Sequence, residues 1–474
     1  MDTKWVEGLT FREGPKYMVV RDAIARAVEL GHLDTGAKLP PVRDLAYRLS
    51  ITPGTVARAY SILTDQGVLR GEVGRGTFVA DTKTAFLPEV PSEGRPATYY
   101  DPVPHGTALD DGPVSLMSPG IANRGQAEYL RKLLTEVAQD PPSGLMHYPT
   151  RESFRAVREA AKHWLRHANL GTLDEIDIVM AHGGQNAILL VMQAVLRGRR
   201  PTVLVEELSY AGFRRAAQLL RADVVPVAMD AHGIIPSALE AAAGPEAQLL
   251  CMTPNLHNPT CLFTPEWRRR EIAAVARRCN FHILEDDWYQ VPGLPAPSYR
   301  QLAPERSWYV SSISKLVTPS LRIGFAVSPP GGGRHLRRAA EDGFFGLATV
   351  LADVAAKMMT DPVVEALVDD VRATYRERIQ VLLNHLGGYD ITWQTDAPIC
   401  WLRLPEGWRT TAFCTAAEAQ GVRVRSGEDF APREANTPQA VRIALNASIP
   451  LERFEAAARS LRDLLDTPPE RVGV

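Results

Sequence analysis

A single lysine between two apolar segments constrains this chain more than any other feature. Residues 308–310 and 323–327 are strand candidates, and the sequence Ser311-Ser312-Ile313-Ser314-Lys315 turns between them. A proline and Arg322 follow the lysine before the second strand begins. The pattern predicts a strand, a hydroxyl-rich turn and a second strand, with Lys315 presented at the end of a sheet.

The residues around Lys315 are of the kinds that bind phosphate. Ser312 and Ser314 offer hydroxyl groups and Arg322 offers a planar guanidinium. A lysine becomes a covalent catalyst when its amine forms a Schiff base with a carbonyl compound. Pyridoxal 5'-phosphate (PLP) combines an aldehyde with a phosphate, so this stretch predicts a PLP site. The alternative interpretation is a surface turn with an ordinary solvated lysine.

Length and composition narrow the class of protein. A chain of 474 residues exceeds one ordinary domain, so two or three domains are expected. The 53 basic and 55 acidic residues nearly cancel, so any nucleic-acid site must be local. Five scattered cysteines without a C-x-x-C pair favour the reducing cytoplasm and argue against a disulfide framework or a zinc site. Neither a signal peptide nor a membrane-spanning segment is expected.

The first eighty residues are predicted to form a winged helix-turn-helix domain. Three helix candidates and then two strand candidates follow one another at 16–30, 39–49, 53–66, 68–70 and 77–79. A proline opens the third helix, and a tight glycine-rich loop joins the strands. In this fold the third helix enters the major groove of DNA.

Three motifs in this domain resemble the DNA-binding domain of GntR-type regulators. They are Leu39-Pro40-Pro41-Val42-Arg43-Asp44-Leu45-Ala46, Thr55-Val56-Ala57-Arg58-Ala59-Tyr60 and Gly74-Arg75-Gly76-Thr77-Phe78-Val79. The predicted contacts to phosphates and base edges are Arg43, Thr52, Thr55, Arg58 and, at the tip of the wing, Arg75. A double-stranded DNA operator is the expected partner, and a protein-binding module with ordinary surface arginines is the alternative.

Residues 81–113 hold six prolines without sustained periodicity and are predicted to be a linker. Short apolar strands then alternate with helices over 114–474, which predicts an α/β fold with a mainly parallel sheet and helices on both faces. The strand candidates are 202–205, 249–253, 281–285, 308–310 and 323–327, and the helix candidates are 151–166, 185–196, 210–220, 265–278 and 352–359. From about residue 361 a long helix, two strand candidates (399–404 and 441–445) and a further helix predict a smaller α+β lobe.

Polar and aromatic residues stand at the ends of these strands, where α/β proteins bind ligands. A turn at Gly184 leads into a helix at Gln185, and a helix N-terminus favours a phosphate. Tyr210 is placed to stack on a pyridine ring. Asp286 ends a buried strand, where a protonated pyridine nitrogen is a natural partner for a carboxylate. Arg442 suits a substrate carboxylate, although it is also compatible with a solvent-facing position in an alternating strand.

This series of residues resembles the fold-type I aminotransferases over nearly all of 114–474. The resemblance implies that Lys315 forms the internal aldimine, that Asn258 and Tyr289 bind the ring hydroxyl, and that Tyr148 reaches the phosphate of the neighbouring subunit. The implied cofactor residues are Tyr148, Gly184, Gln185, Tyr210, Asn258, Asp286, Tyr289, Ser312, Ser314, Lys315 and Arg322, and Arg442 is the implied carboxylate clamp.

With its GntR-like head, the whole chain resembles the MocR-type regulators, a family of PLP-dependent transcription factors built as homodimers, usually head-to-tail. Three positions depart from the family pattern. Ser153 stands where a glycine is expected, with Val157-Arg158 in place of Leu-Arg, and Cys261 replaces the glycine after Asn-Pro-Thr. Trp288 occupies the usual tyrosine position, so either Trp288 or Tyr289 faces the cofactor, and we favour Tyr289.

Two functions are compatible with this organisation. In the first, the protein is a DNA-binding regulator that senses a small amino compound, which displaces Lys315 by transaldimination and is held by Arg442. In the second, it is an active PLP-dependent aminotransferase with an accessory head. We favour the regulator because the head retains both its helix-turn-helix and its wing.

Overall fold

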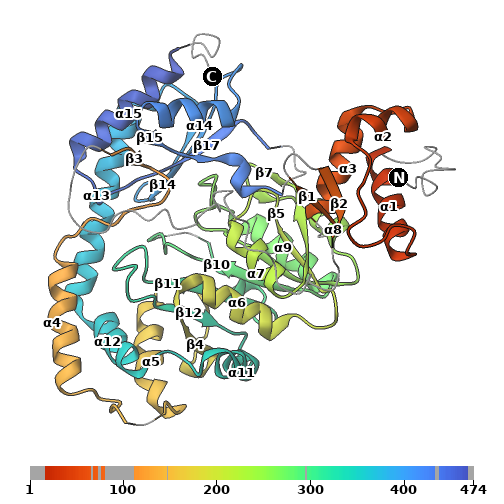
Figure 1. Ribbon diagram of the computed structural model, residues 1–474. Helices are drawn as coiled ribbons and strands as arrows, with labels where there is room; N and C mark the ends of the chain where they lie inside the picture. Colours follow the sequence, from red (N-terminus) through yellow and green to blue (C-terminus); the bar gives the residue numbers. More distant parts are fainter. Residues whose placement is uncertain are drawn as a thin grey trace. The chain divides into compact units, whose positions relative to one another are not determined.

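The computed structural model describes residues 16–65, 68–72, 76–80, 112–146, 148–293, 296–432 and 437–467. It divides the chain into two compact units, residues 1–100 and 101–474. Figure 1 labels the helices and strands of each unit where the view has room for them. The predicted linker, 81–113, falls almost entirely outside the described residues, so its boundaries stay a prediction. None of the described helices is long and apolar enough to cross a membrane.

The N-terminal unit has the three helices and the hairpin of a winged helix-turn-helix. Its elements are α1 (Lys16–Glu29), α2 (Val42–Leu49), α3 (Pro53–Asp65), β1 (Leu69–Glu72) and β2 (Gly76–Val79), and the two strands pair antiparallel. The buried side chains of Ile24, Leu45 and Val56 join the three helices in one core. The second helix begins at Val42 and not at the predicted Leu39, because Pro41 holds an extended backbone (ψ 143°).

The second unit is organised around a seven-stranded sheet in the order β4-β12-β11-β10-β9-β5-β6. Its strands are β4 (Ile178–Ala181), β5 (Thr202–Glu206), β6 (Asp223–Val227), β9 (Ala247–Met252), β10 (His282–Asp286), β11 (Ser307–Ser312) and β12 (Gly324–Val327). All neighbours pair in parallel except β12, which runs antiparallel to both β11 and β4. The predicted mainly parallel sheet is therefore confirmed.

Both faces of this sheet are buried by helices. The helices are α4 (Gln126–Gln139), α5 (Arg155–Trp164), α6 (Gly183–Val195), α7 (Ala211–Leu219), α8 (Pro236–Ala242), α9 (Glu266–Arg278), α10 (Tyr299–Leu302), α11 (Gly333–Phe344) and α12 (Thr349–Thr360). Alternate residues of one strand enter different cores: Val203 and Val205 pack with α6 and α7, whereas Leu204 packs with α8 and α9. Burial on both faces explains why these strands are apolar throughout.

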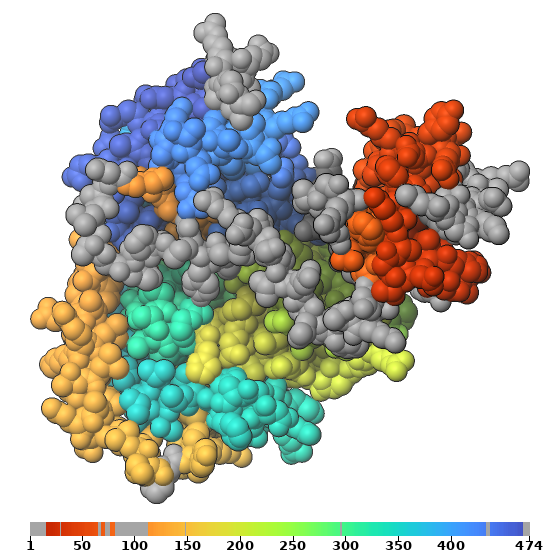
Figure 2. Space-filling model, in the orientation of Figure 1, coloured from red at the N-terminus to blue at the C-terminus, as the bar shows by residue number. Residues whose placement is uncertain are grey.

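A smaller lobe follows at the C-terminal end of the chain. The long helix α13 (Pro362–Leu386) begins where the Asp361 side chain accepts a hydrogen bond from the backbone N–H of Val363. A four-stranded antiparallel sheet then forms in the order β13-β14-β17-β16, covered by two helices. The elements are β13 (Ile391–Thr392), β14 (Ile399–Arg403), α14 (Thr410–Ala419), β16 (Arg425–Ser426), β17 (Ala440–Ala444) and α15 (Leu451–Leu465). Figure 2 shows this lobe as the blue surface of the second unit.

The first residues of the second unit pair with a strand of the small lobe and hydrogen-bond to its sheet. A short strand, β3 (Val114–Ser115), pairs in parallel with β15 (Val422–Arg423). The segment that follows β3 carries Met117, whose carbonyl oxygen accepts hydrogen bonds from two arginines of the small sheet. The start of the second unit therefore packs against the small sheet.

Candidate functional site

Lys315 lies in the turn that joins β11 to β12, as the sequence predicts. Ser312 at the end of β11 pairs with Gly324 at the start of β12, so the turn projects beyond the sheet. Lys315 is half-buried. Burial, and then the positive charges of Arg442 and Arg322, lower the pKa of its amine to about 8. About a tenth of the Lys315 amines are then unprotonated at pH 7, which makes this lysine a competent nucleophile.

The N-terminus of α6 and the turn of Lys315 form a tight cradle. Gly183 has a left-handed backbone (φ +78°), and a Cβ atom there would lie 2.4 Å from Nη2 of Arg322. A Cβ on Gly324 would lie 2.6 Å from the carbonyl carbon of Gly183. The Ser314 hydroxyl is buried and has no hydrogen-bond partner within the described parts of the chain. Backbone N–H groups at a helix start, a guanidinium and a buried hydroxyl together fit a phosphate.

Gln185 and Tyr210 pack against each other beside this cradle. The Gln185 side chain donates to the carbonyl oxygen of Gly212 (3.0 Å). A Cβ on Gly212 would lie 2.1 Å from both Gln185 and Tyr210, so the three residues are in close contact. The Gln185 amide thus holds the start of α7, where Tyr210 precedes the first turn. Its direct role in phosphate binding stays a prediction.

Three consecutive acids at the end of β10 have different surroundings. Glu285 accepts from the backbone N–H of Tyr299 (2.7 Å), and burial raises its pKa to about 7. Asp287 accepts from the Tyr309 hydroxyl (2.7 Å). Burial and the carboxylates of Asp287 and Glu206 raise the pKa of Asp286 well above its usual range. A cationic pyridine nitrogen would relieve this cost, so Asp286 fits the partner that the sequence predicts for it.

Asn258 and Arg442 meet across the two lobes. Arg442 lies in the middle of β17 and is only 6% exposed, so the solvent-facing interpretation is wrong. Its Nη1 donates to Oδ1 of Asn258 (2.8 Å) and its Nη2 to the carbonyl oxygen of Met117 (2.6 Å). Its guanidinium lies 5.0 Å from the centre of the Phe430 ring. Arg442 is therefore fixed in position, and its charge is close enough to Lys315 to lower the lysine pKa.

Trp288 and Tyr289 differ in how their polar atoms are used. The Trp288 indole N–H donates to the carbonyl oxygen of Leu256 (2.9 Å). The Tyr289 hydroxyl is buried and has no hydrogen-bond partner among the described residues. However, the Tyr289 ring packs against Tyr375 of α13 (6.1 Å between centroids). The contact of Tyr289 with a cofactor stays a prediction.

The other departures from the family pattern have local explanations. Cys261 adopts the left-handed backbone (φ +62°) for which a glycine is usual, and its thiol donates to the carbonyl oxygen of Ile399 (3.3 Å). Ser153 and Thr150 exchange hydrogen bonds just before α5. Arg158 is buried and pairs with Glu175. None of these substitutions removes a polar group from the neighbourhood of Lys315.

Tyr148 lies on the surface, and so do most of the predicted DNA contacts that the structure describes. The Tyr148 side chain is 87% exposed, and its neighbour His147 lies outside the described residues. In the N-terminal unit Arg43, Thr52 and Arg58 are exposed and Thr55 is half-buried. The Thr52 and Thr55 hydroxyls are 2.9 Å apart, and the Arg58 guanidinium lies 4.3 Å from the Tyr17 ring centre. Arg75 lies outside the described residues.

The sequence interpretation missed a buried pair behind Asp286. Glu206 ends β5 and accepts from the backbone N–H of Thr253 (3.1 Å). His257 Nε2 lies 3.3 Å from the same Glu206 oxygen, and its Nδ1 lies 2.6 Å from the Thr260 hydroxyl. The pair thus anchors the loop that carries Asn258. The signal that could have found Glu206 is an acid at the end of an apolar strand, because Asp286 was recognised by the same pattern.

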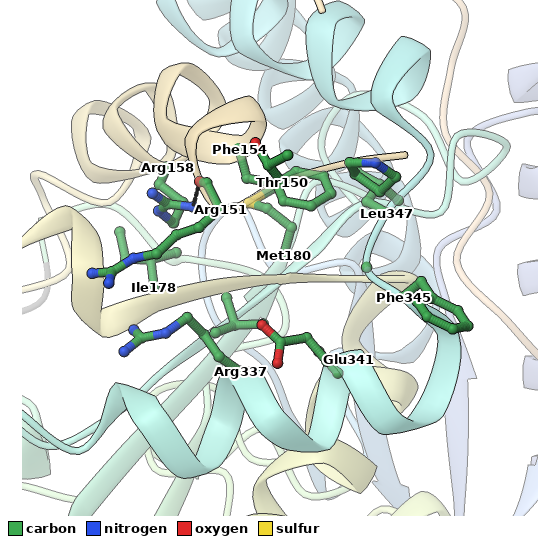
Figure 3. A pocket seen from close by; sticks show the side chains of 14 residues that line it. Thr150, Arg151, Phe154, Arg158, Ile178, Met180, Arg337, Glu341, Phe345 and Leu347 are labelled. Carbon is green, nitrogen blue, oxygen red and sulfur yellow. Dashed lines mark hydrogen bonds between the residues drawn. The ribbon is translucent and has the colours of Figure 1, made fainter. Parts of the chain in front are cut away.

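A cavity of about 90 Å³ lies elsewhere, at the edge of the large sheet (Figure 3). It is bounded by α5, β4 and α11, with Arg151, Arg158 and Arg337 on one side and Phe345 on another. Lys315 is not among its lining residues. The candidate site is therefore defined by the convergence of functional groups around the lysine and not by this cavity.

Comparisons with known proteins agree with both units. Residues 123–461 match the family of class I and II aminotransferases, and residues 16–79 match the gntR family of bacterial regulatory proteins. The solved structure of the multiple substrate aminotransferase from Thermococcus profundus has the same fold, with a TM-score of 0.67 and 20% identity over 77% of this chain and 94% of that one. A GntR domain joined to an aminotransferase-like body defines the class of MocR-type regulators.

Relatives match across both units. The chain is 26% identical to the HTH-type transcriptional regulator YdeF of Bacillus subtilis, over 98% of this chain and 97% of YdeF. It is 25% identical to the probable rhizopine catabolism regulatory protein MocR of Rhizobium meliloti, over 86% of this chain and 85% of MocR. The chain belongs to the class I and II aminotransferase family and is a MocR-type regulator with a GntR DNA-binding domain.

Proposed function

We propose that this regulator holds PLP at Lys315 and changes its binding to an operator when an amino compound takes the place of the lysine. The observation that carries the proposal is the set of three groups at this end of the sheet: the anion cradle with Arg322, the guanidinium of Arg442, and the buried acid Asp286, which ends the strand next to the one that leads to Lys315. Burial, and then the positive charges of Arg442 and Arg322, lower the pKa of the Lys315 amine to about 8. The cradle matches the phosphate of PLP and Asp286 matches its ring nitrogen. Arg442 matches the carboxylate of an amino-acid ligand.

Different residues would bind different parts of the cofactor. Arg322, Ser312 and Ser314 would hold the phosphate at the start of α6, and Asp286 would hold the ring nitrogen. Tyr210 would cover a ring face, and Asn258 would reach the ring hydroxyl. When bound, PLP supplies an aldehyde carbon that can exchange one amine for another.

The protein's own side chains then control the exchange. The Lys315 amine must lose its proton before it attacks, and burial beside two guanidiniums favours that loss. Arg442, already fixed by Asn258 and Met117, would receive the ligand carboxylate without reorganising. Such preorganisation lowers the cost of binding a small ligand. Only a difference in the ligand's affinity for two states of the protein can shift the protein between them.

We further propose that the protein acts as a homodimer in which each subunit completes the other's site. Tyr148 and Met146 are almost fully exposed, and so is Phe345. Pro149, next to Tyr148 in the chain, lines the same cavity as Phe345. Exposed apolar side chains of this kind are suited to burial against a symmetric partner.

Replacing the lysine tests the cofactor site. Lys315→Ala should abolish the visible absorbance of the PLP-loaded protein and leave its circular dichroism unchanged. Lys357→Ala removes an exposed lysine of α12 and serves as the matched control. An unchanged visible spectrum in Lys315→Ala would show that another amine holds the cofactor.

Operator binding tests the regulatory half of the proposal. An electrophoretic titration of the protein against DNA from upstream of its own gene should show a specific complex. The amine that takes the place of Lys315 should change the affinity of the protein for this DNA. The lowered pKa of Lys315 also supports a working aminotransferase as a second candidate. Turnover of amino acids at about 1 per second or faster, without specific DNA binding, would favour the enzyme over the regulator.

A further inference from the structure

One loop of the second unit is hydrogen-bonded to the small lobe at two places. The loop, residues 254–261, lies between β9 and α9 and belongs to the large lobe, which is built on the seven-stranded sheet. The Gln394 side chain follows β13 of the small lobe and donates to the Cys261 carbonyl oxygen (2.7 Å). The Cys261 thiol donates to the carbonyl oxygen of Ile399, the first residue of β14 (3.3 Å). Both bonds therefore cross from one lobe to the other.

The same loop carries Asn258, the partner of the proposed carboxylate clamp. Oδ1 of Asn258 accepts from Arg442 of β17 (2.8 Å), which is a third bond between the lobes. The backbone N–H of Cys261 donates to the His257 carbonyl oxygen (2.8 Å), so one tight turn contains both Asn258 and Cys261. The position of Asn258 relative to Arg442 is therefore linked to the way the small lobe holds Cys261.

Cys261 has a backbone conformation that disfavours a cysteine. Its backbone is left-handed (φ +62°), a conformation that glycine adopts without strain and other residues adopt at a cost. Its side chain is only 2% exposed. A thiol is a weak hydrogen-bond donor, but its bond to Ile399 is one that a glycine could not make. The cysteine thus combines local backbone strain with a contact between the lobes.

We propose that Gln394 and Cys261 are positioning residues, which hold the small lobe against loop 254–261 and keep Arg442 in its ligand-binding position before a ligand arrives. This inference rests on the proposed function of the Lys315 site. A protein whose binding-competent state is only partly populated binds its ligand more weakly by that fraction. Bonds that hold the lobes together therefore strengthen ligand binding without touching the ligand.

The thiol of Cys261 reports whether the lobes separate. Full-length protein is labelled with iodoacetamide after the two half-buried cysteines are replaced as Cys279→Ser and Cys414→Ser. Burial raises the pKa of the Cys251, Cys261 and Cys400 thiols, so each is unreactive until the structure around it opens. Mass spectrometry of peptides follows the three labelling rates separately. Labelling of Cys261 alone measures separation of the lobes, whereas labelling of all three measures general unfolding.

Gln394→Ala should make Cys261 more accessible. We expect the labelling rate of Cys261 to rise about 2- to 10-fold, the range for loss of one neutral hydrogen bond, while the rates of Cys251 and Cys400 stay unchanged. A wild-type rate at Cys261, or an equal rise at all three cysteines, would overturn the proposal.

Gln439→Ala is the matched control. Gln439 accepts a hydrogen bond of the same length from the backbone N–H of Thr410 (2.7 Å), but both residues belong to the small lobe. Its replacement should leave the labelling rate of Cys261 unchanged. If Gln439→Ala raised that rate as much as Gln394→Ala does, any loosening of the small lobe would have the same effect, and the role assigned to Gln394 would be overturned.

Ligand affinity tests the effect on Arg442 in the PLP-loaded protein. The common L-amino acids are screened by the visible spectrum, and the tightest binder is compared with the amine that lacks only its α-carboxylate. The ratio of the two dissociation constants measures the carboxylate contact. Gln394→Ala should lower this ratio about 2- to 10-fold and leave the affinity for the amine unchanged. Damage to the cofactor site would instead weaken both ligands.

Three substitutions of Cys261 separate its contact from its strain. Cys261→Ala removes the thiol and keeps the strained backbone, Cys261→Gly removes both, and Cys261→Ser keeps a donor. We expect Ala and Gly to lower the ratio by the same factor and Ser to retain part of it. A full ratio in Cys261→Gly would show that the thiol contact has no positioning role.

The possible failures are distinguishable. If none of the amino acids changes the visible spectrum, the proposed sensing function is overturned, and the labelling of Cys261, which needs no ligand, still decides whether Gln394 holds the lobes together. If the ratio is the same in every variant, the positioning role is overturned and the Lys315 site stands.

Discussion

The two units of this protein present their functional candidates in opposite ways. In the N-terminal unit, Arg43 and Arg58 are exposed side chains on the surfaces of α2 and α3. In the second unit, Asp286 and Arg442 are buried at strand ends and inside a strand, at 5% and 6% exposure. A buried charge depends on its neighbours far more than an exposed one does. We therefore expect substitutions at buried charges of the second unit to have large effects, and substitutions at exposed charges of the N-terminal unit to have small, separate effects.

Gly324→Ala should have the largest effect of any single substitution near the Lys315 site. The added methyl group would lie 2.6 Å from the carbonyl carbon of Gly183, and backbone cannot move aside as a flexible side chain can. We expect a loss of at least about 1–3 kcal/mol in the free energy of unfolding, the usual cost of overpacking, and loss of PLP retention. Thermal melting and the visible spectrum measure the two effects.

Gly343→Ala is the matched control for that substitution. Gly343 lies in α11, and a Cβ there would meet nothing within 4 Å. An alanine in an open helical position should stabilise the protein by about 0.5–1 kcal/mol. Equal destabilisation by both substitutions would mean that the cradle is not as tightly packed as the close approach of β12 to α6 indicates.

The sequence predicted the parts of the site that are local and missed those that depend on register. Lys315 with its hydroxyl turn, and Asp286 at the end of an apolar strand, were recognisable because each pattern lies within a few residues. Arg425 faces Arg442 only because β16 pairs with β17, and no local pattern specifies that register. Likewise β6 was missed, because its sequence DVVPV contains a proline and is half exposed at the edge of the sheet.

Arg442→Gln should be the next most severe change, and it should weaken binding of the ligand but not binding of the cofactor. Loss of a hydrogen bond to a charged group predicts about 10- to 100-fold weaker binding of any amino acid that responds to the site. PLP should remain bound, because the cradle at α6 does not include this residue. Amino-acid titrations of the visible spectrum measure the affinity. Unchanged affinity would place the ligand carboxylate elsewhere.

The pH dependence of PLP loading should reveal the state of Lys315. Its folded pKa of about 8 lies below its ordinary value of 10.5, so the amine is protonated and unreactive below about pH 8. The loading rate of the apoprotein should rise about tenfold per pH unit below 8 and level off above it. In Arg442→Gln the midpoint should move upward, because one of the cations that lower the pKa is gone. A flat profile from pH 6 to 9 would contradict the assignment.

Changes in the head should have the smallest effects, and this contrast tests the comparison most directly. Arg43→Ala removes one exposed guanidinium from α2, so operator binding should weaken moderately, and the slope of log K against log salt should decrease in magnitude by about 1. Arg26→Ala removes an exposed arginine from the last turn of α1 and should leave that slope unchanged. Fluorescence anisotropy at several salt concentrations gives both slopes. If Arg43→Ala instead abolished DNA binding at every salt concentration while the domain stayed folded, the exposed arginines of the N-terminal unit would depend on their neighbours as strongly as the buried charges of the second unit do, and the contrast between the two units would fail.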